Sequence, residues 1–149
     1  MSGDADMIKL YSQRILALSA DIPHLDRLSE PQATAKKRSP LCGSTVTVDL
    51  TLQNGKISQY GQDVKACALG QASAAISGAA ILGCSRADVA RARDQLTAML
   101  KSGGPVPDAP FDGFDVLQPA KDYKNRHASI LLTLDATLDA FDKALELAA

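Results

Sequence analysis

The sequence predicts an α+β fold in which a small three-stranded antiparallel sheet packs against helices. Apolar and polar residues alternate from residue 46 to residue 53, which is the period of a half-buried strand. Asn54-Gly55 follows at once and is the strongest short indication of a hairpin. Residues 68–82 are then rich in alanine, serine and glycine, and later segments carry apolar residues at helical spacing. One helix is expected before the sheet and three after it.

The helix before the sheet is expected to begin after Asp4 or Asp6, either of which can cap it. Its apolar residues repeat at helical spacing, and it is expected to run to about Ser19 before Pro23.

The three strands are expected at residues 32–39, 46–53 and 56–64. The alternation in the second strand predicts one buried face and one solvated face, and the solvated face includes Asp49. Gly61 is expected to mark a bulge in the third strand.

The first helix after the sheet covers residues 68–82, and its small side chains permit close approach to a sheet or to another helix. Ser85 and Asp88 predict a capping box for the next helix, and residues 102–105 end it. Residues 106–119 are expected to form a long loop that Phe111 and Phe114 pin to the body.

The last helix follows residues 122–127 and carries one apolar stripe. The members of that stripe are Ile130, Leu131, Leu134, Leu138, Phe141 and Leu145. Asp135, Asp139 and Asp142 are expected to form the solvated side of this helix.

Length and composition limit the classes of protein. The 149 residues suggest one domain, 1–149. The net charge is −1 and the densest basic cluster, residues 36–38, lies in an expected strand, so nucleic acid is not favoured as a partner. No apolar run is long enough to span a membrane, and residues 1–6 lack the character of a signal peptide. We therefore expect a cytoplasmic protein whose three cysteines are reduced thiols or ligands.

Cys67 stands where a strand ends and the small-residue helix begins. The positive end of a helix dipole lowers the pKa of a thiol there and favours the thiolate, which binds metal or attacks sulfur. Cys42 precedes the long strand, so the hairpin should return Cys67 to the same end of the sheet. Two thiolates suit zinc or the iron of an iron–sulfur cluster, and His127 is a third candidate ligand. The alternative is a small buried cysteine at a helix boundary.

Four motifs follow one another along the chain: Pro40-Leu41-Cys42-Gly43, the Asn-Gly hairpin, Cys67-Ala68-Leu69 with Ala72-Ser73-Ala74, and Arg126-His127-Ala128-Ser129. Together they resemble the U-type iron–sulfur cluster assembly scaffolds, which comprise IscU, SufU and the N-terminal domain of NifU. They follow the family's order over nearly the whole chain, and the long connection after Ser102 is more similar to the SufU branch. The resemblance implies that Cys42 and Cys67 match the first two ligand cysteines and His127 the histidine before the third.

The chain departs from that family at three positions. Ser44 stands where the family has an aspartate, Ala128 where it has the third cysteine, and Ala66 where a glycine is usual. Cys84 follows the helix that Cys67 begins and would lie about 25 Å away along it, so we expect a buried residue and not a ligand.

The resemblance implies a scaffold or carrier that binds iron or a cluster, with zinc as the alternative metal, at Cys42, Cys67 and His127. A cysteine desulfurase and cluster-accepting apoproteins would be its partners, and a homo-oligomer is compatible with the sequence. Two alternatives stay open: a partner-binding module of the same fold without a cluster, and a thiol protein that accepts sulfur from the desulfurase. No phosphate loop, Ser-His-Asp set or pair of catalytic carboxylates is present, so we do not expect an enzyme.

Overall fold

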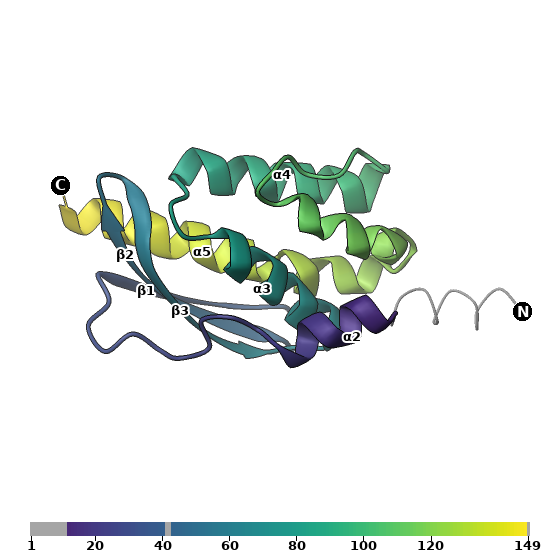
Figure 1. Ribbon diagram of the computed structural model, residues 1–149, viewed down its shortest axis with the longest axis horizontal. Helices are drawn as coiled ribbons and strands as arrows, with labels where there is room; N and C mark the ends of the chain where they lie inside the picture. Colours follow the sequence, from purple (N-terminus) through teal and green to yellow (C-terminus); the bar gives the residue numbers. More distant parts are fainter. Residues whose placement is uncertain (1–11, 41–42, 149) are drawn as a thin grey trace, which may run out of the picture.

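The computed structural model describes residues 12–40 and 43–148, and it has the α+β architecture that the sequence predicts (Figure 1). Three antiparallel strands form one sheet in the order β1-β2-β3. The elements in chain order are α2 (Gln13–Ala20), β1 (Ala33–Arg38), β2 (Thr45–Gln53), β3 (Lys56–Lys65), α3 (Ala68–Ala80), α4 (Arg86–Ser102), the 3-10 helices η1 (Asp112–Asp122) and η2 (Lys124–Arg126), and α5 (His127–Ala148).

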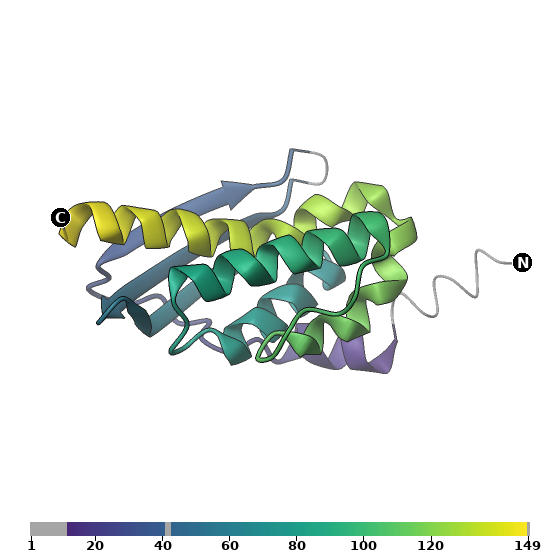
Figure 2. The same cartoon turned by 90° about the horizontal axis from the view of Figure 1, so that it is seen from above.

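The helices form two layers on one face of the sheet. α5 crosses β1 and β2 and also contacts α3, which in turn lies against β3. α4 lies beside α5 on the side away from the sheet, as Figure 2 shows from above. α5 is therefore the central element, because sheet, α3 and α4 all pack on it.

The second face of the sheet is not solvated at Asp49, contrary to the sequence prediction. The Asp49 side chain is fully buried, because the segment before β1 covers it. Arg27 donates to its carboxylate through Nε and, at 3.0 Å, through a terminal nitrogen, while the Leu28 N–H and the Thr34 hydroxyl also donate to it. This carboxylate therefore anchors the covering segment.

The sequence predicted a bulge at Gly61, but the irregularity between β2 and β3 lies at a different position. The register of β2 and β3 shifts between Thr51 and Leu52, whereas Gly61 pairs regularly with Asp49. A Cβ at Gly61 would lie 2.5 Å from the Asp26 carbonyl oxygen, so the glycine is needed for the close approach of the covering segment.

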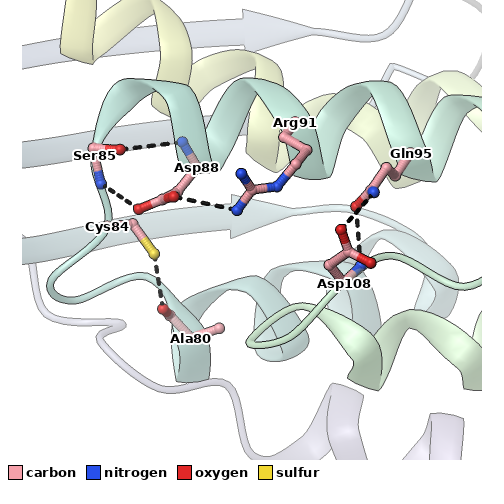
Figure 3. A network of polar contacts seen from close by, with 7 residues as sticks. All are labelled: Ala80, Cys84, Ser85, Asp88, Arg91, Gln95 and Asp108. Carbon is pink, nitrogen blue, oxygen red and sulfur yellow. Dashed lines mark hydrogen bonds and ion pairs between the residues drawn. The ribbon is translucent and has the colours of Figure 1, made fainter.

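The helix ends combine confirmed and revised predictions. Ser12 caps α2 by accepting from the Ile15 N–H, and the caps predicted at Asp4 and Asp6 lie outside the described residues. The capping box of Ser85 and Asp88 at the start of α4 is present (Figure 3). Gly103 ends α4 in the left-handed conformation at φ 66°.

Residues 112–122 form a 3-10 helix, so the expected long loop was wrong over this part. Four buried residues recur at a spacing of three, which matches the three residues per turn of a 3-10 helix. They are Phe111, Phe114, Leu117 and Ala120. The two phenylalanines do pin the segment to the body, as predicted, and stack on each other.

The aspartates of α5 are not simply solvated. Asp135 accepts from Arg93 at 2.7 Å and Asp142 from Arg86 of the neighbouring α4. Asp139 pairs with Lys143 on α5 itself. The predicted apolar stripe is buried along most of its length, but Leu145 is exposed.

In the described part of the chain, none of the helices combines the length and the hydropathy that a membrane span requires.

Substituting Asp49→Asn should lower the free energy of unfolding at neutral pH by about 1–3 kcal/mol, because a buried, charge-assisted set of hydrogen bonds is lost. Burial alone would raise the pKa of Asp49, but the bonds from Arg27, Thr34 and Leu28 outweigh it and hold that pKa below its ordinary value. The stabilisation is therefore complete above the ordinary carboxyl pKa of about 4 and is lost as the pH falls through the lower, folded value.

Urea denaturation of wild type and variant across the acid range measures this effect. Asp115→Asn is the matched control, because within the described residues Asp115 makes an exposed ion pair with Arg14, and its loss should cost at most about 1 kcal/mol. Equal losses in the two variants would contradict the anchoring role of Asp49.

Candidate functional site

Cys67 caps the N-terminus of α3, directly after β3. Thr45 pairs with Lys65, so the start of β2 lies beside the end of β3 and the hairpin folds back as predicted. The sulfur is half-buried and lies 3.6 Å from the Ser129 Oγ of α5. The Ser129 hydroxyl in turn lies 3.1 Å from the Ser44 Oγ. Side chains from three separate segments therefore form one chain of contacts that begins at the thiol.

Small residues of α3 make this meeting possible. A Cβ at Gly70 would lie 2.6 Å from the Ser129 Oγ, so only glycine allows α5 to approach so closely. One turn later the Ser73 hydroxyl donates to the Ile130 carbonyl at 2.5 Å. The small-residue helix therefore serves close packing against α5.

The surroundings of Cys67 favour its thiolate. Burial tends to raise the pKa of the thiol, but hydrogen bonds from the Gly70 and Leu69 N–H groups, the Ser129 hydroxyl and the Arg126 side chain outweigh burial and lower the pKa. Backbone N–H groups at a helix start and a nearby guanidinium are the usual causes of a reactive cysteine.

The hydroxyls can follow the ionisation of the sulfur, because a serine proton rotates freely. A protonated Cys67 donates to Ser129, which donates to Ser44. When the sulfur is ionised, the Ser129 proton can turn towards it. The pair of serines therefore accommodates both states.

Cys84 has the opposite character, as the sequence predicts. It is buried at the end of the α3 segment, and its Sγ donates to the Ala80 carbonyl at 3.2 Å (Figure 3). Burial and the nearby Asp88 raise its pKa. Its thiol is thus held in the unreactive, protonated form.

His127 opens α5, and its ring is buried. Its Nε2 lies 2.9 Å from the Ala120 carbonyl oxygen and 3.1 Å from that of Lys121. Both partners are acceptors, so Nε2 carries the proton and a neutral ring keeps its lone pair on Nδ1. Ser129 lies two residues further on, about 200° around the helix, so the two side chains leave α5 on different sides.

The structure therefore locates two of the three predicted ligands, and it places them in different surroundings. Cys67 lies with Ser44 and Ser129, His127 lies against the end of η1, and Cys42 falls outside the described residues. A shared pocket for all three predicted ligands stays a prediction. Within residues 12–40 and 43–148 no three side chains of His, Cys, Asp or Glu gather as a metal site would require.

Ser129 was missed as a site residue. The sequence placed it in the motif with His127 but gave no reason to choose it. Its role depends on Gly70, 59 positions earlier, whose missing side chain lets the hydroxyl reach the sulfur.

The sequence matches no protein-family model and no curated protein. Solved structures do match. The N-terminal part of a nitrogen-fixing NifU-like protein from Brucella abortus is 40% identical, with a TM-score of 0.91, and the match covers 95% of this chain and 98% of that one. FiSufU from Fervidobacterium islandicum AW-1, assigned as an iron–sulfur cluster assembly scaffold for the SUF system, is 19% identical with a TM-score of 0.79, and the match covers 90% of this chain and 98% of that one.

The second structure supports the fold alone at that identity. The first combines high identity with nearly complete coverage of both chains, and its fold is the one described above. This chain therefore belongs to the family of NifU-like N-terminal proteins.

Proposed function

We propose that this protein is a scaffold or carrier of iron–sulfur cluster assembly that holds iron or a cluster through thiolates. The observation that carries the proposal is the Cys67 thiol, half-buried and with a lowered pKa, at the start of α3. The thiolate is the form that binds iron. The NifU-like protein from Brucella abortus, to whose family this chain belongs, supports the same role.

Cys67 and Cys42 would supply the sulfur ligands, and the Nδ1 of His127 is the candidate third ligand. A metal-binding histidine usually donates its other ring N–H to a carbonyl or carboxylate, which is what Nε2 of His127 does. Ser44 and Ser129 are neutral hydroxyls and do not balance the charge of a metal. We therefore expect the remaining ligands to come from water or from a partner's cysteine, which suits a cargo that is passed on. Zinc would accept the same donors.

In this role the protein is not an enzyme. A cysteine desulfurase would supply sulfur, and apoproteins would receive the cluster. Two alternatives use the same fold: a partner-binding module that holds no cluster, and a thiol protein in which Cys67 or Cys42 accepts sulfur. The lowered pKa of Cys67 supports the second alternative as well, because the thiolate is also the nucleophile.

The Cys67→Ala variant should lose the uptake of iron and sulfide during anaerobic reconstitution, because it removes the thiolate ligand. Cys84→Ala is the matched control and should reconstitute like the wild type, since Cys84 is buried and protonated. Iron and sulfide per chain are the readout. Unchanged uptake in Cys67→Ala would refute a thiolate site there, and no uptake by the wild type would favour the partner-binding module.

Ser129→Ala should raise the pKa of Cys67, because one hydrogen bond that stabilises the thiolate is lost. The pH dependence of alkylation, resolved for each cysteine by peptide mass spectrometry, gives this pKa. In the wild type, Cys67 should react at lower pH than Cys84. Ser77→Ala is the control, since Ser77 bonds Thr133 in the same helix interface. If neither variant changes the pKa of Cys67, Ser129 does not stabilise the thiolate and is not part of the site.

The sulfur-accepting alternative predicts that wild-type protein raises the turnover of a cysteine desulfurase and that Cys67→Ala does not. A desulfurase rate that the wild type leaves unchanged counts against that alternative.

A further inference from the structure

A groove with a volume of about 620 Å³ runs along α5 between β1 and α4. Its lining on α5 extends from His127 to Asp142, which is about 22 Å of helix. Ser39 and Pro40 line it where β1 ends, next to the turn that carries Cys42 in the sequence. The groove therefore leads to the segment that precedes a predicted ligand.

The charges of this groove are unbalanced. Each of its three carboxylates already has a cation: Asp135 bonds Arg93, Asp142 bonds Arg86, and Asp139 pairs with Lys143. Four further cations line the groove without an ion pair to any carboxylate in the described part of the chain. They are Lys37, Arg38, Lys101 and Lys124. This excess of positive charge lies on a protein whose net charge is −1.

Lys37 occupies a position where β1 would otherwise be buried. It follows Ala33 and Ala35 at the two-residue period of a strand, and both alanines are buried on the face towards α5. Its Cα partner is the buried Val46. A lysine on the inner face of an edge strand also hinders strand-to-strand aggregation. That explanation does not extend to Lys101 and Lys124, which come from α4 and η2.

Lys101 and Lys124, together with Leu100 and His127, also line a smaller cavity of about 310 Å³. Two lysines from separate elements therefore line the same open space, where one carboxylate could pair with both.

We propose that this groove docks an acidic segment of a partner protein. The four free cations favour carboxylates, and they come from three separate elements, so a segment with several carboxylates can contact more of them than a single small anion can. The segment would bring its protein to the turn that carries Cys42. The idea that docking brings a partner to Cys42 rests on the proposed function, whereas the binding of an acidic segment to the groove does not.

Fluorescence anisotropy with a labelled hexaglutamate peptide tests the proposal. Wild type should bind it more tightly at low salt than at physiological salt, because exposed charge pairs are screened. The double variant Lys101→Gln, Lys124→Gln should weaken binding by about tenfold. The matched control is Lys56→Gln, Lys65→Gln, which removes the same charge from exposed positions of β3 and should bind like the wild type.

Equal weakening in both double variants, or no binding by the wild type, would overturn the proposal. Inorganic phosphate that displaces the peptide completely at comparable concentration would also overturn it, in favour of a small-anion site. Iron and sulfide uptake separates the docking hypothesis from the scaffold hypothesis. Both are supported if the Lys101→Gln, Lys124→Gln variant binds the peptide weakly and still takes up iron normally. If the wild type binds the peptide but takes up no iron, the docking groove is supported and the scaffold role is refuted.

Discussion

The close approach of α3 and α5 at Gly70 is the constraint on which the site depends. Because Gly70 has no side chain, the Ser129 hydroxyl reaches the thiol of Cys67. The contact continues along α5 through hydroxyls four residues apart. Thr133 meets Ser77, and Thr137 meets Tyr60 at 2.8 Å. Since Thr137 itself donates to the Thr133 carbonyl, the Tyr60 hydroxyl is the donor between the two.

This interface is polar but satisfied, so it can be packed tightly without an energetic penalty for unpaired groups. Burial raises the pKa of Tyr60 to about 12, which keeps the phenol protonated as a donor. Hydroxyls fix the relative rotation of two helices more strictly than aliphatic side chains, because each bond has a required direction. The thiol is thereby held at a defined place between α3, α5 and the start of β2. Such order is what the proposed thiolate ligand would need.

The sequence was sufficient for those parts of the fold that rest on local patterns. The alternation in β2, the Asn54-Gly55 turn and the Ser85 capping box each depend on neighbouring residues, and each is present. The errors arise from long-range packing. Asp49 is buried because residues 26–28 cross the sheet, and the same crossing explains Gly61. The 3-10 helix η1 did have a local pattern, a buried residue at every third position, but the prolines and glycine favoured a loop.

For the site, the sequence predicted which backbone segments lie together but not which side chains contact the sulfur. Topology brought the start of β2 and Cys67 together, as expected from the hairpin. The contacts that set the chemistry could not be inferred, because they depend on side chains from α5. Ser129 lies 62 positions from Cys67, and the orientation of His127 depends on two carbonyls at the end of η1. Helical periodicity places both residues on α5 but does not say which one faces the sulfur.

We propose that this protein carries iron or an iron–sulfur cluster on thiolates, and the iron and sulfide content of the protein after purification without oxygen tests this directly. We expect iron in near-stoichiometric amount, with sulfide if a cluster is held, and loss of both on exposure to air. Protein that is folded, with reduced thiols, and yet free of iron, sulfide and zinc would contradict it.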